Sequence, residues 1–205
     1  MKARRDDKPA NKLVCLESYW NERLFDTFSV KGFFEAMAPL TPLTLAHRFV
    51  DSEAGLAYYL RRPGGVMWRQ KEAFDAPIYY LAFHGRPASV SLVLGRVAGE
   101  RIIEAFSGYG DNGYRNLAYF AACSVLRGKR GMDFARAFLR ATGMQAVIGY
   151  TTRVDWMNSL VCDMLFLHRF YRDPAPWKSL KRIYASVLRD YPRARSLGYT
   201  LVTPG

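Results

Sequence analysis

Two short apolar runs constrain the fold of this chain more than any other feature of its sequence. Ile78 to Phe83 and Leu117 to Ala122 are rich in aromatic side chains, and each is followed by small or polar residues. Such runs are typical of strands that are buried on both faces of an α/β sheet. His84 follows the first run and Cys123 follows the second. Because ligands and reactive groups gather at the carboxyl ends of parallel strands, we expect this imidazole and this thiol at one edge of the sheet.

Strand and helix signals alternate along the rest of the chain. The expected strands cover residues 12–18, 44–50, 78–83, 89–94, 117–122, 145–150 and 198–202. The expected helices cover 29–37, a segment capped by Ser52, 98–106, a segment around 134–141 that ends at Gly143, 154–170 and 177–189. We expect loops at 107–113 and in the basic, glycine-flanked stretch after Cys123. This order predicts an α/β fold with a mostly parallel sheet flanked by helices on both faces.

One helix carries a specific expectation about its buried side. The apolar pattern of residues 154–170 places six side chains on one face, namely Val154, Met157, Val161, Met164, Leu165 and His168. This spacing is helical and gives the helix one largely apolar side. Cys162, which lies in the same helix between Val161 and Met164, is expected in the core.

The length and composition of the chain indicate one folded domain. Its 205 residues, of which 50% are hydrophobic and 15% aromatic, can bury a full core, which excludes a disordered chain. We expect the domain to span residues 1–205, with a short basic N-terminal tail over about 1–11. No run approaches the roughly 18 apolar residues of a membrane span, and no apolar segment follows the charged N-terminus. We therefore expect neither a membrane partner nor a secretory signal.

The cysteine count predicts a reducing compartment. Cys15, Cys123 and Cys162 are odd in number and have no short spacing between them, so a disulfide framework is not expected. The prediction is a cytoplasmic protein. His47 and His168 show no metal-ligand spacing relative to the cysteines, so neither a metal nor a cofactor is expected.

The sequence around His84 and Cys123 resembles the caspase-like cysteine peptidases, in particular the bacterial branch called CHAT domains. That family has a His-Gly pair after its third main strand and a cysteine after its fourth, as His84-Gly85 and Cys123 stand here. The 39 positions between His84 and Cys123 compare with about 50 in caspases. The stretch 146–156 also resembles the strand, loop and helix that follow the cysteine in CHAT-like proteins. The resemblance covers about residues 78–167 and implies a caspase-like fold.

The resemblance implies a cysteine endopeptidase with a Cys-His dyad, acting on a protein or peptide substrate. Cys123 would attack the scissile carbonyl, and His84 would protonate the leaving amine and later activate water. The backbone N–H groups of Gly85 and Cys123 would hold the oxyanion. A role as a bacterial defence or stress effector, with a regulatory protein partner, follows from the same resemblance.

The family also indicates which residues would line the pocket for the side chain before the cut. These are the residue two before the cysteine, Ala121, and the later loop, represented by Tyr150, Arg153, Asp155 and Trp156. Caspases have Gln and metacaspases Asp where this chain has Ala121, so neither specificity carries over. Asp155 favours a basic residue before the cut, and Arg153 an acidic one. An apolar pocket walled by Tyr150 and Trp156 is the third alternative. A role for Asp155 as the cap of the following helix is an equal alternative.

The basic charge of the chain supports an alternative function. The net charge is +12, and eight basic residues lie between Arg169 and Arg195 against only Asp173 and Asp190. Such a surface suits an acidic protein or nucleic acid, although nucleic acid is not favoured because no recognisable binding motif accompanies the charge. The alternative is therefore a non-catalytic caspase-like module that binds its partner through a basic surface. A solvated helix face is the simplest explanation of the charge.

Overall fold

The main sheet of the protein has six strands, five of them parallel. The computed structural model describes residues 11–20, 28–70, 76–109 and 115–204. The sheet order is β2-β1-β3-β7-β8-β9, and β9 alone runs antiparallel to its neighbour. The strands are β1 (Lys12–Glu17), β2 (Thr44–Phe49), β3 (Ile78–Ala82), β7 (Leu117–Ala121), β8 (Ala146–Tyr150) and β9 (Tyr199–Val202). This confirms the predicted mostly parallel α/β sheet.

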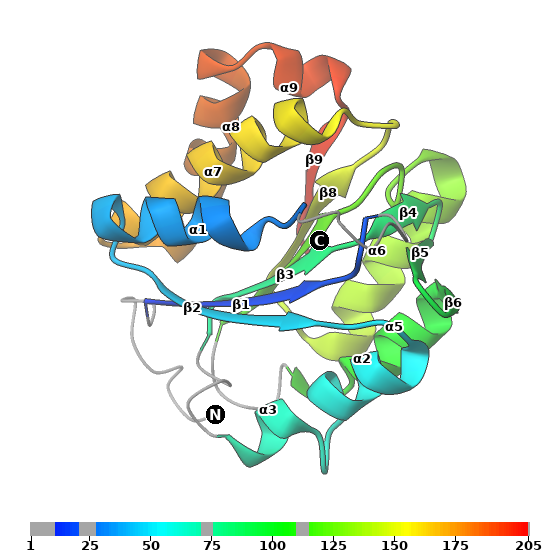
Figure 1. The fold of residues 1–205 in the computed structure, drawn as a ribbon. Helices are drawn as coiled ribbons and strands as arrows, with labels where there is room; N and C mark the ends of the chain where they lie inside the picture. The colour runs from blue at the N-terminus through cyan, green and yellow to red at the C-terminus, as the bar shows by residue number, and fades with distance from the viewer. Residues whose placement is uncertain (1–10, 21–27, 71–75, 110–114, 205) are drawn as a thin grey trace.

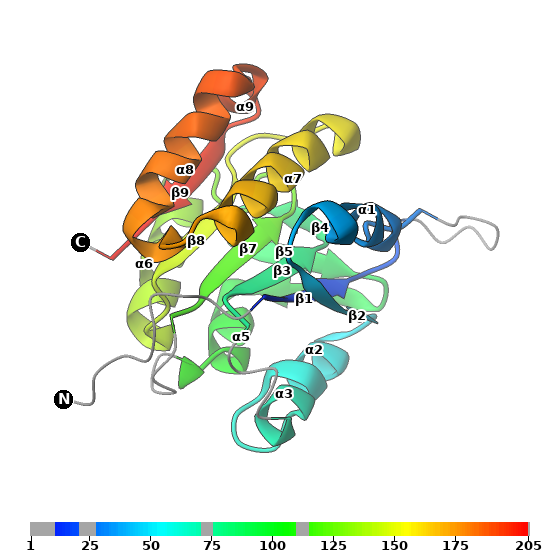
Figure 2. The ribbon, with the colours of Figure 1, turned by 90° about the vertical axis from the view of Figure 1, so that its left-hand side faces the viewer.

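Helices cover both faces of this sheet (Figures 1 and 2). One face packs against α1 (Lys31–Met37), α7 (Trp156–Arg172), α8 (Pro176–Asp190) and α9 (Arg193–Ser196). The other packs against α2 (Glu53–Leu60), α3 (Val66–Arg69), α5 (Gly99–Ala105) and α6 (Gly128–Thr142). A short 3₁₀ helix, η1 (Ala38–Leu40), follows α1. In β3, Tyr80 contributes to the first core and Tyr79 to the second, which explains why the strand is apolar at every position.

A second, three-stranded antiparallel sheet was only partly predicted. It consists of β4 (His84–Arg86), β5 (Ser89–Leu92) and β6 (Gly95–Ala98) and lies beyond the carboxyl end of β3. The sequence predicts a strand over 89–94, where β5 lies, but it indicates neither β4 nor β6. β4 has no buried residue and β6 has one, so both lack the apolar run that marks a strand.

Two helix starts show what the local sequence can and cannot specify. The Ser52 side chain accepts a hydrogen bond from the Gly55 N–H, which confirms the predicted cap of α2. The basic stretch after Cys123 was predicted to be a loop, but Gly128 to Arg130 form the first turn of α6. Glycine and cations are poor N-terminal signals, so the sequence pattern placed this helix start too late.

The apolar side predicted for α7 is only in part its buried side. Val154, Met164 and Leu165 pack on the core as half-buried side chains, and Cys162 is buried as the sequence predicts. Met157 and Val161 are exposed by 54% and 38% of their surface, whereas the face that packs on the sheet carries Cys162, Asp163 and Phe166. A charged residue in the middle of the buried face conceals the helical pattern. Its burial is possible because Asp163 has partners that the sequence does not reveal.

Three tyrosines satisfy the buried Asp163 carboxylate. The hydroxyl groups of Tyr80, Tyr119 and Tyr150 each donate to it at 2.5 Å, from β3, β7 and β8 respectively. Burial raises the pKa of Asp163, and the tyrosine hydrogen bonds lower it only in part, so the pKa is about 6. This carboxylate therefore fastens α7 to three neighbouring strands of the sheet.

The raised pKa of Asp163 predicts a pH-dependent stability. The unfolded carboxyl has a pKa of about 3.9, so the folded chain holds this proton more tightly, and stability is lost as the pH rises through about 6. Relative to Asp163→Asn, the wild-type free energy of unfolding should fall by about 2 kcal/mol between about pH 4 and pH 7. Urea unfolding at a series of pH values measures this. Asp133→Asn, at an exposed site, is the control, and a pH-independent difference for Asp163→Asn would contradict the prediction.

Candidate functional site

The β3–β7 pairing brings His84 and Cys123 to equivalent positions at the sheet edge. In the parallel register, Ala82 is the partner of Ala121. His84 comes two residues after Ala82, and Cys123 comes two residues after Ala121. Both line one cleft of about 590 Å³. The cleft is lined by His84, Gly85, Arg86, Pro87, Ser91, Cys123, Ser124, Arg127 and Arg153.

The imidazole of His84 is oriented by a backbone carbonyl. Its Nε2 lies 2.7 Å from the carbonyl oxygen of Trp20, and the two rings meet edge to face with centroids 5.4 Å apart. A carbonyl oxygen only accepts hydrogen bonds, so Nε2 must carry the proton. In the neutral ring, Nδ1 therefore keeps its lone pair and can accept a proton.

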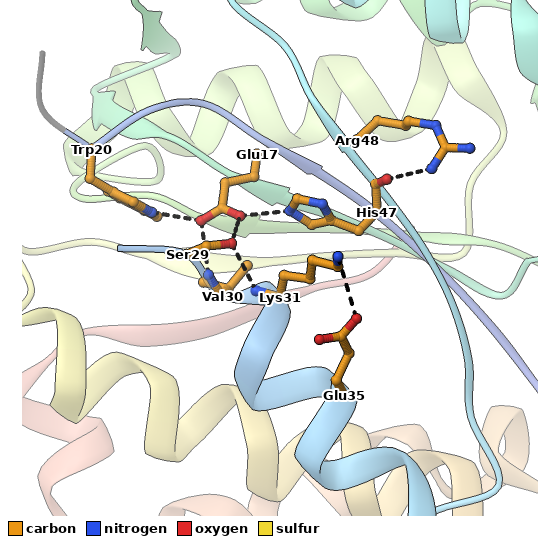
Figure 3. Close-up of polar contacts among 8 residues, drawn as sticks. All are labelled: Glu17, Trp20, Ser29, Val30, Lys31, Glu35, His47 and Arg48. Carbon is orange, nitrogen blue, oxygen red and sulfur yellow. Dashed lines mark hydrogen bonds and ion pairs between the residues drawn. The ribbon is translucent and has the colours of Figure 1, made fainter. Parts of the chain in front are cut away.

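Trp20 is held in turn by a buried carboxylate. Glu17, the last residue of β1, is fully buried, and Figure 3 shows its side chain at the centre of four donors. The donors are Trp20 Nε1 at 2.7 Å, Ser29 Oγ at 2.6 Å, the Val30 N–H at 2.9 Å and His47 Nε2 at 2.7 Å. Burial raises the pKa of Glu17, but these hydrogen bonds outweigh burial and lower the pKa overall. Glu17 is therefore ionised and links β1, β2 and the start of α1 to the residue that orients His84.

The thiol of Cys123 is half-buried beside the backbone of Val154. Its sulfur lies 3.5 Å from the Val154 nitrogen and 3.6 Å from the Val154 carbonyl oxygen. The other two cysteines are fully buried. Burial raises the pKa of Cys15, and it raises that of Cys162 to about 12, with the charge of Asp163 adding to the effect. Cys123 is thus the one thiol of the three that reaches a cleft.

The backbone on the C-terminal side of Cys123 is in an uncommon conformation. Ser124 has φ +56°, in the left-handed region that side-chain-bearing residues seldom adopt, and it is buried. Its N–H donates to the Thr152 carbonyl at 2.8 Å, and the Leu126 N–H donates to the Tyr150 carbonyl at 3.1 Å. These bonds continue the contact between β7 and β8 past the end of β7. They hold the strained turn that presents Cys123 to the cleft.

Gly85 is required by the close approach of β4 to this turn. A Cβ on Gly85 would overlap the Cys123 carbonyl oxygen and a methyl group of Val125. On the far side of the turn, the Ala88 N–H donates to the Val125 carbonyl at 3.0 Å. The strand that carries His84 therefore packs directly on the segment that carries Cys123.

The residues predicted to line the pocket are only partly brought together. Arg153 lines the cleft, whereas Tyr150 is fully buried and bonded to Asp163. Asp155 accepts the Asn158 N–H at 3.0 Å as the N-cap of α7, the alternative considered from the sequence. Trp156 packs on Phe28 and Phe33, with centroids 4.2 and 5.2 Å away. Ala121 ends β7, where it is half-buried and packs against the core, and it is not among the residues that line the cleft.

The basic C-terminal helices form a separate hollow between α7 and α8. Its arginines are largely engaged by carboxylates. Arg169 and Arg189 contact Asp190, and Arg182 contacts Asp173, all within 2.9 Å. The charge on this face is therefore partly neutralised by its own carboxylates.

Several residues of the site could not be found by sequence reasoning. The Trp20 carbonyl leaves no signal in the sequence, because every residue has a backbone carbonyl. Glu17 did leave a signal, a carboxylate that ends the otherwise apolar strand Lys12–Glu17 at the same sheet edge. Sequence spacing indicates no metal-ligand role for His47, and the structure pairs it with Glu17. Among the described residues, no group of three or more His, Cys, Asp or Glu side chains is arranged to hold a metal ion.

A scan against protein-family models matches residues 10–198 to a family of unknown function, DUF6642. The chain belongs to the DUF6642 family. A search of curated proteins finds none that matches this DUF6642 chain. In the part of the chain that the structure describes, no helix is long and apolar enough to cross a membrane.

The packing of Gly85 predicts a marked cost for the smallest side chain at this position. Gly85→Ala should lower the free energy of unfolding by about 1–3 kcal/mol, because the added Cβ would overlap the Cys123 carbonyl oxygen and side-chain atoms of Val125 and Ala122. Gly32→Ala, in α1 with nothing within 4 Å of the added Cβ, is the matched control and should not destabilise. Thermal or urea unfolding of both variants measures the difference. Equal stabilities of the two variants would contradict the packing.

The burial of the three cysteines predicts selective alkylation. In the native protein, iodoacetamide should modify Cys123 well before Cys15 or Cys162, because both buried thiols have raised pKa values and no access to solvent. Peptide mass spectrometry of timed samples measures the rates, and labelling in urea should remove the difference. Modification of Cys162 as fast as Cys123 under native conditions would refute this assignment.

Proposed function

We propose that this protein is a caspase-like cysteine endopeptidase whose Cys123 and His84 form the catalytic dyad. The observation that carries the proposal is the shared cleft, which both side chains reach from paired, neighbouring strands. In chain order, β3 and β7 are the third and fourth strands of the main sheet. The caspase-like family has its histidine and cysteine after those two strands.

The state of each group suits its proposed role. Nε2 of His84 is bound to the Trp20 carbonyl, so Nδ1 is the nitrogen free to exchange a proton with the thiol, the leaving amine or water. The Val154 N–H donates to the Cys123 sulfur and fixes its position beside the cleft. His84 is exposed and Cys123 is half-buried, so a substrate can reach both from the cleft.

Catalysis by this dyad needs no group beyond the two side chains, backbone amides and water. Cys123 gives its thiol proton to His84, and its sulfur attacks the scissile carbonyl carbon. The C–N bond then breaks, and His84 passes that proton to the leaving amine. Water then loses a proton to His84 and attacks the thioester, releasing the carboxylic acid and the Cys123 thiol. The N–H groups of Gly85 and Cys123, at the wall of the same cleft, are proposed to hold the oxyanion in both steps.

Digestion of a peptide library, with the products identified by mass spectrometry, tests this function. The wild-type protein should produce new termini, and Cys123→Ala and His84→Gln should each lower the rate by about a thousandfold or more. His168→Gln, a histidine change in the separate α7–α8 hollow, is the control and should retain the wild-type rate. Unfolding curves should confirm that all three variants fold. Full activity in folded Cys123→Ala would rule out the proposed dyad.

A further inference from the structure

The cleft with His84 and Cys123 continues into a second hollow of about 540 Å³. The two hollows share Arg86, Pro87 and Arg127 in their walls. The second hollow extends past Arg96 to the first turn of α6, where Lys129 and Arg130 lie. We call the combined surface the basic trough.

The three-stranded sheet contributes one face to the basic trough. His84 on β4 is the cross-strand partner of Ser91, which is the partner of Arg96 on β6. Arg86 lies two residues after His84 and therefore projects from the same face. Val90 on β5 and Val97 on β6 are cross-strand partners that point to the opposite face, and both are buried in the core. The strand alternation thus gathers a histidine and two arginines on the side that faces the solvent.

The cations of the basic trough are exposed, and within the described part of the chain none of them has a carboxylate partner. They are Arg86, Arg96, Arg127, Lys129, Arg130 and Arg153. Among the described residues, none of these six makes an ion pair, and no Asp or Glu side chain lines either hollow. The trough ends at a third hollow, where Lys129 and Arg130 are joined by Glu100 and Asp133. The charge is therefore uncompensated from the catalytic cleft to this boundary.

The start of α6 increases the positive potential of the trough. Its N-cap, Arg127, makes no side-chain capping bond, and the first turn holds no acidic residue. Helix N-termini carry partial positive charge and are usually stabilised by acidic side chains, but here Lys129 and Arg130 stand in that turn. Uncompensated like charges destabilise a folded chain, so an anionic ligand that neutralises them would be bound favourably.

From these observations we propose that the basic trough binds an acidic segment of the polypeptide whose peptide bond lies at Cys123. This rests on the proposed peptidase function, and it assigns the substrate class: a protein with clustered Asp or Glu beside the cleavage site. This preference for acidic residues is opposite to the basic preference that Asp155 suggests from the sequence. The Asp155 carboxylate caps α7 and is not among the residues lining the cleft, so it does not set the preference. The arginines can form bidentate hydrogen bonds with carboxylates along the trough.

Binding to the inactive Cys123→Ala protein tests the proposal without requiring catalysis. The probe is a fluorescent peptide with a short run of glutamates, compared by anisotropy with the same peptide carrying glutamines. The glutamate peptide should bind at least about fivefold more tightly, and the preference should weaken as salt is added. Equal affinity for the two peptides would overturn the proposal.

A matched pair of charge variants locates the binding surface. The trough variant is the Cys123→Ala protein that also carries Arg96→Gln, Lys129→Gln and Arg130→Gln. Its affinity for the glutamate peptide should be lower by about fivefold or more. The control, Lys181→Gln, Arg193→Gln and Arg195→Gln, removes the same charge from exposed sites on the C-terminal helices and should have little effect. Equal losses in both variants would mean general attraction to a basic protein and would overturn the proposal. So would tighter, trough-dependent binding of a single-stranded oligonucleotide of the same length.

The library digestion separates this inference from the function on which it rests. Cleavage that is enriched in Asp and Glu beside the cut, and that the trough substitutions slow, supports both the peptidase function and the acidic substrate class. Cleavage without acidic enrichment overturns the substrate assignment and leaves the peptidase intact. An absence of cleavage, together with trough-dependent binding of the glutamate peptide, overturns the peptidase function and retains recognition of acidic segments.

Discussion

The parallel pairing of β3 with β7 is the constraint on which the rest of the site depends. Its register puts Ala82 beside Ala121, so the chain leaves both strands at the same height and delivers His84 and Cys123 to one edge. Both strands are apolar because helices cover both faces of the sheet, and this burial leaves no freedom to shift the register. Gly85 then allows the two exit segments to pack against each other without a side chain between them.

Two buried carboxylates stabilise the architecture around that edge in different ways. Glu17 gathers donors from β2, from the start of α1 and from Trp20, and through the Trp20 carbonyl it reaches the imidazole of His84. Asp163 gathers three tyrosine hydroxyls and fastens α7 to the sheet. Hydrogen bonds lower the pKa of Glu17 below its usual range, whereas burial dominates at Asp163 and raises its pKa to about 6. The first carboxylate supports the proposed catalytic group, and the second supports the core.

The distribution of positive charge distinguishes two surfaces that the sequence presents as equivalent. On α7 and α8, three arginines, Arg169, Arg182 and Arg189, have Asp173 or Asp190 as partners, so the richest basic segment of the sequence is partly self-neutralised. The basic trough draws its cations from separate strands, the start of α6 and the loop before α7, and they have no such partners among the described residues. Net charge alone could not reveal this, because compensation depends on which side chains meet in space.

The sequence by itself determined the α/β class, most strand positions and the candidacy of His84 and Cys123, because apolar runs and turn residues act locally. It did not determine β4 or β6, whose exposed residues give no apolar signal, nor the buried face of α7, where Asp163 interrupts the pattern. Two predicted segments lie largely outside the described residues. They are residues 1–10 of the N-terminal tail predicted over 1–11, and residues 110–113 of the loop predicted at 107–113. Only the tertiary structure decided that Tyr150 points into the core and that the Trp20 carbonyl meets His84. These outcomes depend on partners distant in the chain, and their contacts exist only after the strands have paired.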